Sequence, residues 1–255
     1  EGAVFEHTKA IEINPTEASS YYGRGLSKVQ LEDYEGGIAD YTKAIEINPN
    51  YAEAYESRGS AKVDLKDYED SIADYTKAIE IKPSDAGLYK IRANSKAYSK
   101  DYEGAIADYT KVLEINPKEL VYFQRSNAKY HLGDYEGAIA DLSKEIEVNP
   151  GSADYAEAFY FRGLMKSKLK DYEGEIADLN KAKELGSEVA KKTLNQYLES
   201  SSARSQKELE IDPISAEAYC SRANSKINVE DYEGAIADYT KAIEINPNYA
   251  EAYNN

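Results

Sequence analysis

The sequence predicts an all-α fold, a right-handed α-solenoid (superhelix) of stacked 34-residue helix–turn–helix repeats. Two markers recur along the 255 residues in one frame. The prolines are separated by 34 residues, apart from one step of 33 and one of 63: Pro15, Pro49, Pro83, Pro117, Pro150, Pro213 and Pro247. The tripeptide Asp-Tyr-Glu begins at Asp33, Asp67, Asp101, Asp134, Asp171 and Asp231. Between these markers, apolar residues recur at three- and four-residue spacing, as one face of a helix requires.

Residues 52–83 show how one repeat is expected to fold. The first helix begins near Ala52 and ends near Lys66. Asp67 then caps the second helix, because its carboxylate can accept hydrogen bonds from free backbone N–H groups. The second helix ends before Pro83, which cannot continue a helix and disfavours the helical conformation just before itself. Such a pair of short helices cannot bury its own apolar face, so it must stack on its neighbours.

The long step between Pro150 and Pro213 divides the chain into three predicted parts. Residues 1–186 form an array of a half repeat plus about five units. Residues 214–255 form a resumed unit and a partial first helix. Residues 187–213 are either a degenerate repeat or capping and junction helices, because Gly186 and Ser187 replace the usual Asn-Pro and a polar helix follows over 188–199.

The first and last repeats are incomplete in the sequence. Residues 1–15 align with residues 35–49, so the chain is expected to begin within a second helix and to stop within a first helix. One interpretation is a window on a longer array. A second is head-to-tail self-association, which is heterologous and produces rings or open filaments. A third is a truncated chain whose ends are frayed.

Composition excludes several classes of function. The 47 acidic and 31 basic residues leave a net charge of −16, which argues against nucleic acid or an anionic membrane as partner. One cysteine, Cys220, and two histidines, His7 and His131, leave little for metal or acid–base chemistry. There is no Gly-rich phosphate loop, nucleophile–base set or zinc motif, and no apolar run long enough to span a bilayer. We therefore expect no enzyme activity, no cofactor, no metal site and no membrane insertion.

Each repeat carries an arginine followed sixteen residues later by an aspartate. The arginines could form a track for phosphate or carboxylate groups, or each could pair with its aspartate on the adjacent helix and fix the register. The constant spacing favours structural ion pairs. The clearest examples are Arg58 with Asp74, Arg92 with Asp108, and Arg125 with Asp141. A threonine ladder on the second helices is expected to be ordinary exposed surface, with modification as the alternative: Thr8, Thr42, Thr76, Thr110 and Thr240, with Ser143.

The repeat resembles the tetratricopeptide repeat (TPR). The residues that stand where this family has its packing residues are Tyr55, Gly59, Ile72, Tyr75, Ala78 and Pro83. The resemblance covers nearly the whole chain. It implies a scaffold whose first helices line a concave groove that holds an extended peptide or protein ligand.

The candidate partner-binding residues vary between repeats and lie three or four apart on the first helices. They are Lys90, Asn94, Tyr98, Phe123, Gln124, Asn127, Tyr130, Tyr160 and Phe161. Aromatic side chains with few rotamers are typical of binding hot spots, and amide side chains can bond a peptide backbone. The alternative is that the aromatic residues only pack against nearby turns.

Some TPR proteins bind the C-terminal carboxylate of heat-shock chaperones with a Lys and an Asn, a further Asn, then a Lys and an Arg on three successive first helices. Lys90 and Asn94 match the opening pair. Gln124, Glu157 and Phe161 replace the other three, so this specificity is not expected. The sequence therefore predicts a non-enzymatic scaffold for protein–protein interaction. The alternative is a structural protein whose units associate end to end into a helical filament.

Overall fold

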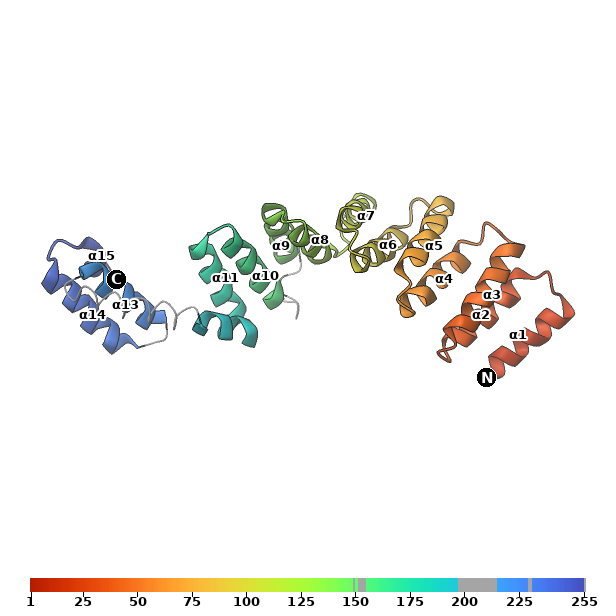
Figure 1. The fold of residues 1–255 in the computed structure, drawn as a ribbon, viewed down its shortest axis with the longest axis horizontal. Helices are drawn as coiled ribbons and strands as arrows, with labels where there is room; N and C mark the ends of the chain where they lie inside the picture. Colours follow the sequence, from red (N-terminus) through yellow and green to blue (C-terminus); the bar gives the residue numbers. More distant parts are fainter. Residues whose placement is uncertain (149, 151–154, 197–214, 229–230, 255) are drawn as a thin grey trace. The chain divides into compact units, whose positions relative to one another are not determined.

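The computed structural model describes residues 1–148, 150, 155–196, 215–228 and 231–254 (Figure 1). All regular secondary structure in these ranges is helical, and they contain no strand. The chain divides into two compact units, Glu1–Val148 and Asn149–Asn255, and each is described by itself.

The first unit is a succession of helices in which each helix packs against the next one along the chain. The helices are α1 (Gly2–Ile13), α2 (Ala18–Val29), α3 (Tyr34–Ile47), α4 (Ala52–Asp64), α5 (Tyr68–Ile81), α6 (Ala86–Tyr98), α7 (Tyr102–Ile115), α8 (Tyr122–His131) and α9 (Tyr135–Val148). The predicted bounds of both helices in residues 52–83 are confirmed by α4 and α5. Helix α1 corresponds to the second helix of a repeat, as predicted.

Among the described residues of the second unit, α10 packs against α11, and α14 packs against both α13 and α15. Their bounds are α10 (Tyr155–Lys168), α11 (Tyr172–Glu184), α13 (Ala216–Asn228), α14 (Tyr232–Ile245) and α15 (Ala250–Asn254). Residues 188–196 are also helical, and Ala190 and Leu194 are buried there. Residues 197–214 lie outside the described ranges, so the choice between a degenerate repeat and capping or junction helices over 187–213 stays a prediction.

The aspartates of the Asp-Tyr-Glu tripeptides cap the second helices, as predicted. Asp33 Oδ1 accepts from the backbone N–H of Gly36 at 2.9 Å, and the other five aspartates make the same bond three residues ahead. A Cβ on Gly36 would lie only 2.1 Å from Asp33 Oδ2, which explains the glycine there. In α5 this residue is Asp70, and its N···O distance to Asp67 lengthens to 3.4 Å.

A tight turn joins the two helices of a repeat. Lys66 has φ +63°, and the N–H of Asp67 donates to the carbonyl of Lys62 at 2.9 Å, which closes the end of α4. The turn at Lys100, with φ +68°, repeats this geometry between α6 and α7. The end of each first helix and the start of its second helix therefore lie at one edge of the repeat.

Small residues allow the helices to approach closely. A Cβ on Gly59 would lie 2.8 Å from the ring of Tyr75, which bears out the packing role predicted for this glycine. At one position of the second helix the side chain is completely buried: Ala44, Ala78, Val112, Ala182 and Ala242. Glu145 takes this position in α9, where it is 8% exposed and its Oε2 has no hydrogen-bond partner.

Candidate partner-binding site

The structure places each predicted arginine against its aspartate on the second helix of the same repeat. Arg58 donates to Asp74 through Nε at 2.9 Å and Nη2 at 2.5 Å. The same two-pronged contact joins Arg92 to Asp108 and Arg125 to Asp141, with distances between 2.5 and 2.9 Å. Two parallel charge-assisted bonds fix both position and orientation, so each pair sets the register of two helices.

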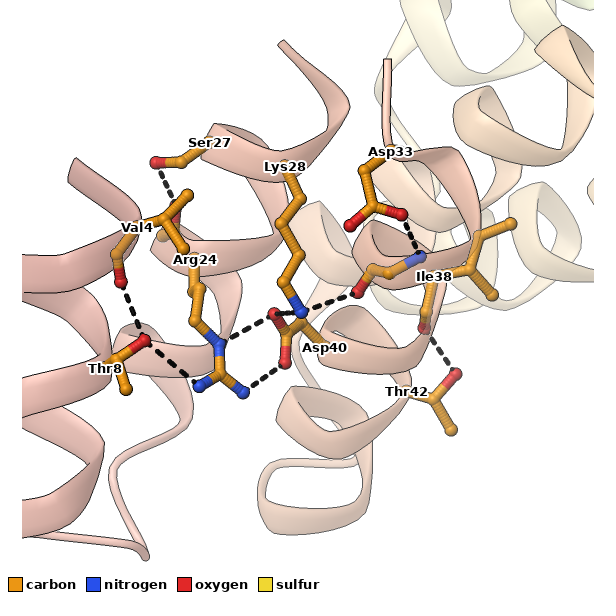
Figure 2. Close-up of polar contacts among 11 residues, drawn as sticks. Val4, Thr8, Arg24, Ser27, Lys28, Asp33, Ile38, Asp40 and Thr42 are labelled. Atoms are coloured by element: carbon orange, nitrogen blue, oxygen red, sulfur yellow. Dashed lines mark hydrogen bonds and ion pairs between the residues drawn. The ribbon is translucent and has the colours of Figure 1, made fainter. Parts of the chain in front are cut away.

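Two further residues complete each ion pair, and the sequence analysis did not identify them. Figure 2 shows the first example, in which Lys28 Nζ lies 2.8 Å from Asp40, and Arg24 Nη1 donates to Thr8 Oγ1 on the preceding second helix. Arg58, Arg92 and Arg125 donate in the same way to the threonine before them, at 3.0 to 3.1 Å. Each of these arginines therefore links three helices across two repeats.

The interpretation of these threonines as ordinary exposed surface is wrong for most of them. Thr42 is half-buried, accepts from Arg58, and donates to the carbonyl of Ile38 at 2.8 Å. Thr240 is exposed. The signal was present in the sequence, because Thr42 precedes Arg58 by the same sixteen residues that separate Arg58 from Asp74.

The charges of the arginine–aspartate pairs have their partners within the chain. Burial by itself would raise the pKa of Asp40, but hydrogen bonds from Arg24 and Lys28 outweigh it and hold the pKa below its ordinary value. The hydrogen bonds that Arg92 donates to Asp108 correspondingly raise the pKa of Arg92. Guanidinium groups used in this way support a structural role rather than a track for anionic ligands.

On α6, the predicted binding residues are partly engaged with neighbouring helices. Lys90 Nζ lies 2.7 Å from Glu119 Oε1, and Asn94 Oδ1 accepts from the hydroxyl of Tyr109 at 2.7 Å. The ring of Tyr98 stacks on that of Tyr68 with centroids 5.3 Å apart. Within the described residues the Asn94 amide NH2 has no partner, so it stays available as a donor.

On α8, the predicted residues are more open. Gln124 and Asn127 are exposed, whereas Phe123 and Tyr130 are half-buried. Asn127 corresponds in the repeat to Asn94, but Leu142 stands where Tyr109 stands. Asn127 therefore lacks the phenol that holds Asn94, and no other described residue bonds its side chain. The ring of Tyr130 lies 5.9 Å from that of Tyr135, which partly fits the alternative of packing against a turn.

Tyr160 and Phe161 lie on α10 and belong to the second unit. Both are half-buried, and their rings meet edge to face with centroids 5.4 Å apart. Of the nine predicted residues, seven therefore belong to α6 and α8 of the first unit and two to α10 of the second unit.

A hollow lies beside the α6 residues. Its volume is about 600 Å³, and it is lined by the segments that precede α6 and α8, including Asp85 and Glu119. Glu119 is the partner of Lys90, so this hollow adjoins the candidate binding residues.

Groups that can support chemistry are few in the described part of the chain. His131 stacks on Tyr102, with centroids 4.5 Å apart. Cys220 is buried, and burial raises the pKa of its thiol. No described group of three or more His, Cys, Asp or Glu residues could hold a metal ion. Of the helices described, none has the length and apolar character needed to cross a membrane.

Family models of the tetratricopeptide repeat match residues 25–66, 52–85, 91–119, 123–190 and 216–249. No curated protein sequence matches the chain. These matches, together with the similarity to solved TPR structures, confirm the predicted all-α solenoid of TPR units.

Similar solved structures include YrrB, described as a TPR protein with an unusual peptide-binding site. It is 22% identical with a TM-score of 0.64, over 72% of this chain and 94% of YrrB. A TPR protein from Parabacteroides merdae ATCC 43184 is 17% identical with a TM-score of 0.63, over 93% of this chain and 96% of its own. MamA from Desulfovibrio magneticus RS-1 is 17% identical with a TM-score of 0.60, over 66% of this chain and 94% of its own.

Proposed function

Because the chain belongs to the tetratricopeptide repeat family, we propose that it is a non-enzymatic scaffold that binds an extended segment of a partner protein on α6 and α8. The observation that carries the proposal is the difference between two equivalent asparagines, Asn94 and Asn127. Both occupy one helical position in successive repeats, and both have side-chain groups without a partner among the described residues.

Asn94 is prepared for binding by its neighbour. The Tyr109 hydroxyl occupies Asn94 Oδ1 and so orients the amide, leaving the NH2 group to donate to a backbone carbonyl of the ligand. Burial raises the pKa of Tyr109 to about 12, so the phenol stays protonated and keeps donating at neutral pH. Holding a donor in place before binding reduces the entropy lost on association.

Asn127 can make both kinds of bond to a peptide. Because Leu142 offers it no hydrogen bond, its carbonyl and its NH2 group are both free to pair with one peptide unit. Phe123 and Tyr130 lie on the same helix and add apolar area beside it. The ligand class that fits is an extended chain with exposed backbone groups and an apolar side chain near Phe123.

Lys90 on α6 is not available to recognise a chain-terminal carboxylate. Lys90 is already paired with Glu119, and both side chains are about one-third exposed, at 36% and 33%. Gln124, Glu157 and Phe161 remain departures from the chaperone-binding pattern, and Glu157 is exposed. An internal segment of a partner is therefore the better candidate than a C-terminus.

A selection from a library of random 12-residue peptides tests the proposal. We expect peptides whose affinity falls about thirtyfold on Asn127→Ala, because two hydrogen bonds are lost, each contributes about 1 kcal/mol net, and about 1.4 kcal/mol corresponds to a factor of ten. Asn224→Ala is the matched control, since this asparagine holds the same repeat position in the second unit and is bonded by Tyr239. Circular dichroism verifies folding of both variants. Equal affinity for Asn127→Ala and the unmodified chain would exclude this site.

End-to-end association is the second candidate. Helix α1 exposes Phe5 and Ile13 at 60% and 85%, and α15 exposes Tyr253 at 60%. Exposed apolar side chains of this kind can be covered by a second copy of the chain. Light scattering across a dilution series separates this candidate from the first, because a scaffold of single chains keeps a constant mass and a filament does not.

A further inference from the structure

Two stacked aromatic pairs lie where first and second helices meet at the turns of the first unit. Tyr68 at the start of α5 stacks on Tyr98 at the end of α6, with centroids 5.3 Å apart and planes 22° apart. Tyr102 at the start of α7 stacks on His131 at the end of α8, at 4.5 Å and 7°. We call these four residues the aromatic edge.

The fold does not require the second ring of either pair. The residues equivalent to Tyr98 and His131 in other repeats are polar: Gln30, Asp64, Lys168 and Asn228. Asp64 ends α4 in a repeat whose helices pack as the others do. Tyr98 is nevertheless 64% exposed and His131 is also exposed, so most of the Tyr98 ring contacts solvent rather than protein. Rings placed so openly are available to a partner.

Exposed carboxylates flank the aromatic edge in the sequence, and one of them, that of Asp70, lies 3.6 Å from Lys62 Nζ. Residues 64–70, 99–103 and 131–136 contain these acids, all exposed: Asp64, Asp67, Glu69, Asp70, Asp101, Glu103, Asp134 and Glu136. The same segments contain only two lysines, Lys66 and Lys100. The cap bonds of Asp67 and Asp101 use one carboxylate oxygen each, so the other oxygen of each faces no described donor.

The second unit offers a contrast. Tyr172 begins α11 as Tyr68 begins α5, and it is 50% exposed. Lys168 takes the position of Tyr98 and His131, whereas Lys170 corresponds to Lys66 and Lys100. Residues 168–173 therefore contain Asp171 and Glu173 with two lysines, so they lack the excess of carboxylate found in residues 99–103.

We propose that the aromatic edge binds a basic, arginine-rich segment of a partner protein. A guanidinium lies flat on an aromatic face and pairs with carboxylates at the rim, and it is less strongly hydrated than an ammonium group. The net charge of −16 steers such a segment toward the chain. This surface lies at the turns, and it goes beyond the binding of an extended peptide by Asn94 and Asn127.

An octa-arginine peptide carrying one tryptophan is the probe. The chain contains no tryptophan, so the peptide alone is excited at 295 nm and its anisotropy reports binding. We expect Tyr98→Leu/His131→Leu to weaken binding about tenfold, since each exposed cation–π contact contributes roughly a factor of three. Leucine keeps the apolar bulk and removes the π face, and Tyr98→Phe/His131→Phe should bind as the unmodified chain does.

Controls separate this proposal from general attraction to an acidic protein and from the proposed function. Tyr172→Leu/Tyr232→Leu removes two exposed rings from the second unit and should leave affinity unchanged. An octa-lysine peptide should bind more weakly than octa-arginine, and its affinity should fall less on the Tyr98→Leu/His131→Leu substitution. Asn127→Ala should not affect octa-arginine, so either proposal can fail alone. The proposal would be overturned if octa-arginine lost the same affinity for Tyr98→Leu/His131→Leu and for Tyr172→Leu/Tyr232→Leu, or lost none for either.

Discussion

Replacement of Arg92 by leucine should destabilise the centre of the first unit by about 3 kcal/mol. The change removes the bonds to Asp108 at 2.8 and 2.7 Å and the bond to Thr76 at 3.1 Å. Breaking a buried ion pair costs about 3–5 kcal/mol, because the remaining charge is left without its partner. The lower end applies here, since Lys96 remains 2.9 Å from Asp108 and compensates part of the lost interaction.

Urea unfolding followed by circular dichroism measures this loss, with hydrogen exchange to locate it. Repeat proteins can lose cooperativity, so exchange of the α5, α6 and α7 amides should accelerate more than that of α1. Lys77→Ala is the matched control, because it breaks an ion pair with Glu80 in which both side chains are 57% exposed. Exposed pairs contribute little to stability, because water and salt screen their charges. Our reasoning is refuted if Arg92→Leu is no more destabilising than this control.

Three further predictions concern buried ionisable groups. The folded chain holds the pKa of Asp40 below its ordinary value. The contribution of Asp40 to stability should therefore be complete above about pH 4 and should be lost as the pH falls through the folded pKa. Acid unfolding of Asp40→Asn, which has no carboxylate to titrate here, checks that stability falls in this direction. Burial raises the pKa of Tyr75 to about 12, so stability should fall between about pH 10 and pH 12 and should fall less in Tyr75→Phe, which cannot ionise; an equal fall in both chains would contradict this. Glu145→Ala should stabilise the chain by about 1–3 kcal/mol in thermal or urea unfolding, because it removes a buried oxygen without a partner and restores the residue of other repeats.

The repeat architecture followed from the sequence because its determinants are local. Asp67 caps α5 with its own side chain, and α5 ends two residues before Pro83. These features depend on backbone groups within a few residues, so a short stretch of sequence contains the whole cause. The arginine–aspartate pairs also followed, because a sixteen-residue step that recurs in every repeat must carry the same geometry each time.

Only the tertiary structure decided which side chains remain open to a partner. The sequence places Asn94 and Asn127 at one position, yet Tyr109 engages the first and Leu142 leaves the second free. Nor does the sequence alone show that Tyr98 stacks on a ring from the preceding repeat. Helical periodicity specifies the face on which a side chain lies, but the availability of its hydrogen-bonding and aromatic groups depends on the atoms that the neighbouring helix brings opposite.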